Sequence, residues 1–164
     1  MLVIKALQFA AKKHKGQERK SSGLPYVTHP VITAYLLTKY KRSKRIDELI
    51  AAAILHDTLE DTDTNFIELA SEFTPFVASL VLQLTSDKEQ IKLIGKNEYL
   101  KKKMLGMSSY GLLLKLVDRL SNIMDNPTDN YKTDTINMIR FLEENARLSG
   151  THKAIIADIK ENLL

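Results

Sequence analysis

Apolar residues recur at helical spacing along most of the chain and predict a series of amphipathic helices. The first begins at the N-terminus and ends before Lys15-Gly16, where a polar, glycine-containing loop follows. Thr28 and Pro30 indicate the start of a second helix that runs to about Tyr40. No segment alternates polar and β-branched residues between turn signals, so the pattern predicts no strand.

The segment 46–55 is apolar on nearly all sides and predicts a buried, central helix, and the segment 112–124 predicts a second, mainly apolar helix. The remaining helices are expected at about 63–72, 74–84, 86–107, 133–147 and 152–163. Asp63 or Thr64 is the expected N-cap of the first of these. His152 begins the last one and is expected to be solvated. The predicted fold class is therefore all-α, with about eight or nine helices. The absence of a long linker predicts one domain over residues 1–164.

Composition removes several classes of protein. The 164 residues include no cysteine, which excludes disulfide scaffolds, zinc-thiolate sites, iron–sulfur clusters and cysteine nucleophiles. No apolar stretch approaches 18 residues, and the basic first twenty residues do not resemble a signal peptide. We therefore expect a cytoplasmic protein without a membrane partner.

The charge is divided unevenly along the chain. Residues 1–45 carry a balance of +10, whereas residues 46–164 carry −6, for a net charge of +4. Such polarity favours an anionic ligand near the N-terminal third, either a phosphorylated small molecule or a nucleic acid. A solvated basic surface is the alternative.

Ionisable residues follow the apolar 46–55 segment directly. His56, Asp57, Glu60 and Asp61 fall within six residues, and helical spacing would place His56 and Glu60 one turn apart, as well as Asp57 and Asp61. An ionised side chain buried at the end of such a helix costs free energy unless it is paired or binds a metal. The alternative interpretation is an acidic helix end that continues into a polar loop.

The second apolar helix carries a similar group, because Lys115, Asp118 and Asn122 share one of its faces. A solvated stripe or a structural ion pair would also explain it. Together with His29, however, the two segments supply two imidazoles and two carboxylates, a donor set that suits Mn²⁺, Fe²⁺, Co²⁺ or Zn²⁺. Such an ion lowers the pKa of a bound water and polarises a phosphoryl oxygen.

These residues follow one another in the order H…HD…D, from His29 through His56-Asp57 to Asp118. The flanking segments narrow the pattern, and they read HKGQERK at 14–20, PYVTHP at 25–30, LHDTLEDT at 55–62 and LKLVDRLSN at 114–122. Together they resemble the HD-domain metal-dependent phosphohydrolases, especially the hydrolase domain of RelA/SpoT-type alarmone enzymes and the stand-alone small alarmone hydrolases. The resemblance spans roughly residues 5–125.

The resemblance implies hydrolysis of the 3′-pyrophosphate of ppGpp and pppGpp to GDP or GTP and pyrophosphate, commonly with Mn²⁺. The positions that match the family's metal ligands are His29, His56, Asp57 and Asp118. The acidic pair that positions or activates the attacking water matches Glu60 and Asp61. The positions that match substrate contacts are Arg19, Lys20, Lys88, Lys115 and Asn122.

Two other functions remain open from the sequence. An HD phosphohydrolase could act on another phosphorylated purine nucleotide, such as ppApp or NADPH, because these substrates share phosphates and a purine. A non-catalytic helical module could instead bind a nucleotide or nucleic acid with the basic N-terminal surface. A nucleic-acid partner is the less expected of these, since binding alone needs no acidic pair beside a metal-binding set.

Overall fold

The computed structural model describes residues 1–163, and within them it contains eleven α-helices and one isolated β-bridge, between Glu18 and Pro25. The all-α prediction is confirmed. All nine expected segments contain helix; one of them, 86–107, is divided into two helices, and a further short helix, Thr58–Asp61, lies outside the expected segments. The chain forms two compact units, Met1–Thr85 and Ser86–Leu164, which are described in turn.

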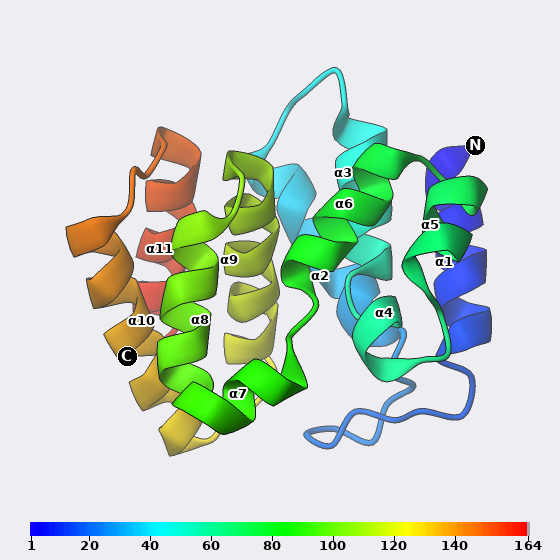
Figure 1. Ribbon diagram of the computed structural model, residues 1–164. Helices are drawn as coiled ribbons and strands as arrows, with labels where there is room; N and C mark the ends of the chain where they lie inside the picture. Colours follow the sequence, from blue (N-terminus) through cyan, green and yellow to red (C-terminus); the bar gives the residue numbers. More distant parts are fainter. Residues whose placement is uncertain (164) are drawn as a thin grey trace. The chain divides into compact units, whose positions relative to one another are not determined.

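The first unit is built around α3 (Ile46–Leu55), which packs against α1 (Leu2–Lys13), α2 (Thr28–Tyr40) and α6 (Pro75–Leu84) (Figure 1). Every residue of α3 from Ala51 to Leu55 is buried. The small alanine side chains allow neighbouring helices to approach α3 closely on several sides. The prediction of a central, buried helix at 46–55 is confirmed.

Two shorter helices, α4 (Thr58–Asp61) and α5 (Phe66–Glu72), complete this unit. The cap of α5 is Asn65, whose side chain accepts the backbone N–H of Glu68, and not the expected Asp63 or Thr64. The helix begins later because Thr64 is buried and its hydroxyl lies 2.7 Å from that of Thr62. The prediction that Thr74 caps α6 is confirmed by its bond to the N–H of Val77.

Five helices form the second unit: α7 (Lys88–Ile94), α8 (Lys96–Gly106), α9 (Ser109–Ile123), α10 (Asp129–Asn145) and α11 (Gly150–Glu161). Within it, α9 packs against α11 and α8 packs against α10 (Figure 1). The lysine-rich segment expected as one helix is divided at Gly95, whose φ of +81° is readily adopted only by glycine. The apolar helix predicted at 112–124 corresponds to α9.

His152 is buried, so the expectation that it is solvated is wrong. Its backbone N–H donates to Ser149 Oγ, and its Nδ1 accepts the backbone N–H of Ser149, which together form a capping box for α11. Its Nε2 lies 2.9 Å from the carbonyl oxygen of Ser109, to which it donates because Nδ1 is the accepting nitrogen. The imidazole therefore joins the beginning of α11 to the beginning of α9.

We expect His152→Ala to lower the free energy of unfolding by about 2 kcal/mol, because it removes two side-chain hydrogen bonds at a buried helix start. Urea denaturation measures the effect. Lys153→Ala, on the exposed face of the same helix, is the matched control and should change stability little. Equal stability of the two variants would contradict the structural role of the imidazole.

Across the described residues, no helix combines the length and the apolar character that a membrane crossing requires.

Candidate active site

The helix α3 ends at Leu55, and His56 and Asp57 form a turn after it. The carbonyl of Ala53 accepts from His56 Nδ1 at 2.7 Å, and the carbonyl of Leu55 accepts from the Thr58 hydroxyl at 2.7 Å. These side chains occupy carbonyls that the backbone of a continuing helix would use. The segment 56–61 is therefore not one continuous helix, but Asp57 and Asp61 are one turn apart as expected, since Asp61 N–H donates to the Asp57 carbonyl at 2.9 Å at the beginning of α4.

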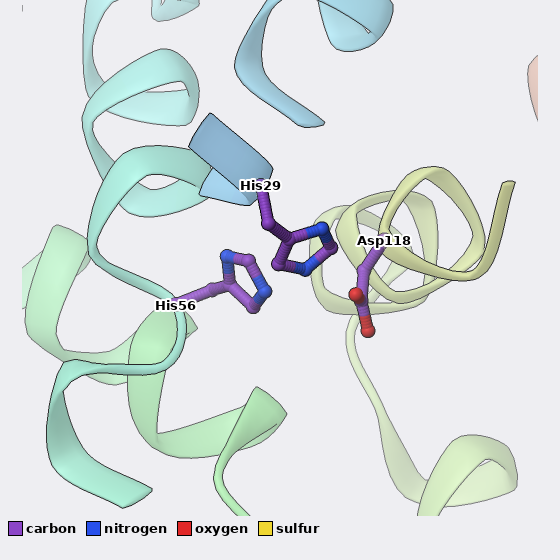
Figure 2. A group of neighbouring side chains, drawn as sticks. All are labelled: His29, His56 and Asp118. Carbon is purple, nitrogen blue, oxygen red and sulfur yellow. The ribbon is translucent and has the colours of Figure 1, made fainter. Parts of the chain in front are cut away.

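Three potential ligand atoms of the first unit face one another. Asp57 Oδ2 lies 3.0 Å from His56 Nε2 and 3.8 Å from His29 Nε2. The rings of His29, at the start of α2, and His56, after α3, lie edge to face with their centroids 5.1 Å apart (Figure 2). Both imidazoles are 2–3% exposed, so the two nitrogens and the carboxylate oxygen meet in a largely buried place.

The donor chemistry of these residues fits a divalent ion. A backbone carbonyl only accepts, so the bond to Ala53 places a proton on His56 Nδ1, and in the neutral imidazole the lone pair is then on Nε2. This arrangement, in which the second ring nitrogen donates to a carbonyl, is typical of metal-ligating histidines. The Asp57 carboxylate would supply negative charge to the same site.

The acidic pair lies on the single-turn helix α4, which packs against α6. Glu60 is half-buried and Asp61 is exposed. The backbone of this segment is also held from outside the helix, because the carbonyl of Asp61 accepts from Gln17 Nε2 at 2.8 Å. The two carboxylates are thus presented on a short, anchored element next to Asp57.

Lys13 tethers the loop that follows α4. Its Nζ lies 2.9 Å from Asp63 Oδ1 and 3.0 Å from Glu68 Oε1. The hydrogen bond to Asp63 raises the pKa of Lys13, and the same bond lowers the pKa of the Asp63 carboxyl. Both groups stay charged around neutral pH, so the tether is lost in acid, as the pH falls through the lowered pKa of Asp63, and in strong base, as the pH rises through the raised pKa of Lys13.

The predicted phosphate-binding pair lies on a hairpin-like loop between α1 and α2. Backbone bonds from Arg19 N–H to the Leu24 carbonyl and from Gly23 N–H to the Arg19 carbonyl close the loop, and Gly23 has a φ of +69°. Arg19 is half-buried, with its guanidinium 5.9 Å from the centroid of the Tyr26 ring. Lys20 is exposed to solvent.

In the second unit, α9 holds a buried carboxylate between two polar neighbours. Asp118, 6% exposed, accepts from Lys115 Nζ at 2.9 Å on Oδ2 and from Asn122 Nδ2 at 2.8 Å on Oδ1. Figure 2 shows the Asp118 side chain projecting from this helix. The i, i+3, i+7 spacing noted in the sequence thus brings all three side chains together. Lys88 is exposed at the first position of α7.

Sequence reasoning missed two residues of this region, Tyr26 and Gln17. The Tyr26 hydroxyl donates to Asp57 Oδ2 at 2.6 Å and lies 3.5 Å from Asp61 Oδ2. Tyrosine and glutamine are common in loops, and their partners are 31 and 44 residues away in the chain. The only available signal was their place inside the family-like segments 14–20 and 25–30.

The model of the HD domain family matches residues 6–137. The chain belongs to the HD domain family. The match includes every residue of the H…HD…D pattern and extends over parts of both compact units.

Within the HD domain family, the chain is similar to proteins named guanosine-3′,5′-bis(diphosphate) 3′-pyrophosphohydrolase MESH1. The Danio rerio protein is 38% identical over 125 residues, which cover 76% of this chain and 68% of the relative. The Homo sapiens protein is 41% identical over 125 residues, which cover 75% and 68%. Among solved structures, a metazoan orthologue of SpoT that hydrolyses ppGpp gives a TM-score of 0.81 at 26% identity, covering 99% of this chain and 97% of that chain.

A divalent metal site is consistent with this family and with the side chains present. Among the described residues, His29 and His56 of the first unit and Asp118 of the second unit are each buried and each offer one ligand atom of a type that binds metal ions. Two imidazoles and a carboxylate form a mixed nitrogen and oxygen donor set, which suits borderline divalent ions.

Proposed function

We propose that this protein hydrolyses the 3′-pyrophosphate of the guanosine alarmones ppGpp and pppGpp with the help of Mn²⁺. One water is consumed, the bond between the 3′-oxygen and phosphorus is broken, and GDP or GTP and pyrophosphate are released. The observation that carries the proposal is the similarity to the MESH1 hydrolases over about two thirds of their length. The arrangement of His29, His56 and Asp57 supports it.

For the metal, we propose His29, His56, Asp57 and Asp118 as the ligands of one divalent ion. When bound, the ion would lower the pKa of a coordinated water and polarise a phosphoryl oxygen. Ligands from both compact units would be needed, so we propose that residues 1–164 act as one functional domain. The Lys115 and Asn122 bonds to Asp118 would fix the direction of its carboxylate.

The other site residues are assigned by their chemistry and position. Glu60 and Asp61 would orient the attacking water and exchange protons with it, because a carboxylate next to the metal ligands can accept a proton without itself coordinating the ion. Arg19 and Lys20 would bind the substrate's phosphates, Arg19 through paired N–H groups and Lys20 as a point charge. Lys115 and Asn122 are proposed to line the nucleotide pocket, and Lys88 is proposed as a further lysine on the phosphate side.

Product analysis with Mn²⁺ tests this function. Purified protein is incubated separately with ppGpp, pppGpp, ppApp, NADPH and a deoxynucleoside triphosphate, and the products are separated by ion-exchange chromatography. Release of pyrophosphate from ppGpp or pppGpp is expected. Turnover of another nucleotide alone would support a phosphohydrolase but refute guanosine alarmones as the substrates. Binding without any turnover would favour a non-catalytic module.

Arg19→Ala should raise KM for ppGpp about tenfold or more, with a smaller change in kcat, because it removes charge-assisted hydrogen bonds to phosphate. The difference from the wild type should shrink as ionic strength rises. Arg42→Ala, an exposed arginine that follows α2, removes the same charge elsewhere in the unit and is the control. A loss that is independent of salt would argue against a phosphate contact by Arg19.

A further inference from the structure

Tyr26 lies against three residues of the proposed site, Asp57, His29 and Arg19. Its hydroxyl donates to Asp57 Oδ2 at 2.6 Å. The edge-to-face contact with His29 has a centroid distance of 6.2 Å, and the guanidinium of Arg19 lies 5.9 Å from the tyrosine ring. One side chain thus lies against two proposed metal ligands and one proposed phosphate ligand.

The Tyr26 ring is also supported by a second layer of side chains. His14, which is buried at the end of α1, stacks on the ring with the centroids 4.8 Å apart and the planes 29° apart. His14 Nδ1 lies 2.7 Å from Gln17 Oε1, and Gln17 Nε2 donates to the Asp61 carbonyl. Because that carbonyl only accepts, the orientation of the Gln17 amide is fixed, and His14 Nδ1 must be the donor.

This network joins the basic loop to the acidic segment by two separate routes. One route runs from the Tyr26 hydroxyl to Asp57, and the other runs from His14 through Gln17 to Asp61. The backbone connects the two routes, since Tyr26 N–H donates to the Gln17 carbonyl at 2.8 Å. A shift of the loop would therefore be transmitted to both Asp57 and Asp61.

We propose that Tyr26 is a positioning residue that sets the Asp57 carboxylate for the metal and, through its ring, sets Arg19 for the substrate's phosphates. This inference rests on the proposed function. The hydroxyl and the ring are assigned different tasks, because the hydroxyl donates to Asp57 and the ring lies against the guanidinium of Arg19. Outer hydrogen bonds to metal ligands typically contribute about 10- to 100-fold to metal affinity.

Two substitutions separate these tasks. Tyr26→Phe keeps the ring and should weaken Mn²⁺ binding, measured by titration calorimetry without nucleotide, by about 10- to 100-fold. With saturating Mn²⁺ its KM for ppGpp should stay near that of the wild type. Tyr26→Leu also removes the ring, so it should show the weakened Mn²⁺ binding together with a raised KM.

Tyr35→Phe is the matched control, because Tyr35 lies on α2 of the same unit and is 59% exposed. It should match the wild type in Mn²⁺ affinity, kcat and KM, and thermal unfolding of the metal-free proteins checks that all variants fold. If Tyr26→Phe behaves like Tyr35→Phe while the wild type binds Mn²⁺ and hydrolyses ppGpp, the positioning role is refuted and the proposed function stands. A wild type that does neither would refute the proposed function itself, and the inference with it.

Discussion

Asp57→Asn is expected to abolish tight Mn²⁺ binding and to lower the turnover of ppGpp about a thousandfold or more, because the bound ion would stabilise the transition state by several kcal/mol. The substitution keeps the size of the side chain and removes its charge. Asp57 Oδ2 lies 3.0 Å from His56 Nε2 and 3.8 Å from His29 Nε2, so the lost charge is the one directly beside both imidazoles.

The fold should survive this change. Asp57 occupies the N-cap position of α4, but its side chain makes no capping hydrogen bond there, and the Tyr26 hydroxyl can donate to an amide oxygen as it does to a carboxylate. We therefore expect the metal-free variant to unfold thermally near the wild type. Asp47→Asn makes the same chemical change at an exposed site in the first turn of α3 and is the control.

Thermal unfolding with added Mn²⁺ gives a readout that does not depend on catalysis. An ion at 100 times its dissociation constant should stabilise the wild type and Asp47→Asn by about 2.7 kcal/mol, and it should stabilise Asp57→Asn much less. Wild-type-like Mn²⁺ stabilisation and turnover in Asp57→Asn would remove Asp57 from the ligand set.

The positions of the helices were predictable because they depend on local periodicity. The mainly apolar segments at 46–55 and 112–124 correspond to α3 and α9, and most residues of both helices are buried. A helix with a wide apolar surface needs neighbours on several sides, so its burial follows from the sequence. The shared face of Lys115, Asp118 and Asn122 on α9 was also predictable, because it depends on the helical repeat.

Helix ends were less predictable, because several polar side chains compete for the same backbone groups. Asn65 caps α5 although Asp63 and Thr64 are equally suited by residue type, and Asp63 is instead bound to Lys13. The turn at His56 and Asp57 depends on side-chain bonds to the last carbonyls of α3, which periodicity does not reveal.

Contacts made by loops depended on the tertiary structure. Tyr26 reaches Asp57 across 31 residues, and His152 reaches Ser109 across 43 residues. His152 was expected on the solvated surface and Tyr26 was assigned no role, since nothing near them in the chain indicates a partner. The candidate ligands themselves were found because the H…HD…D order is a sequence pattern, whereas the side chains that support them were not.

Glu60→Gln and Asp61→Asn are expected to lower kcat for ppGpp by about 10²- to 10⁴-fold while Mn²⁺ affinity stays near the wild-type value, because an amide keeps the shape of the acid but cannot exchange a proton. Both residues lie on α4, directly after Asp57, and the main chain of Asp61 is held by Gln17 through its carbonyl. That bond does not involve the side chain, so Asp61→Asn should keep the position of the segment. The two measurements, kcat and Mn²⁺ affinity, distinguish the acidic pair from the metal ligands, because substitution of a metal ligand would lower both.

Asp63→Asn is the matched control, since it changes an exposed acid two residues further along the same segment. The hydrogen bond from Lys13 lowers the pKa of the Asp63 carboxyl and keeps that group ionised and engaged, so it is not suited to exchange protons with a water near neutral pH. We expect Asp63→Asn to retain wild-type kcat. Single-turnover rates at saturating Mn²⁺ measure the chemical step in all three variants, and a rise in KM at constant kcat for Glu60→Gln and Asp61→Asn would make these residues binding groups instead of proton-transfer groups.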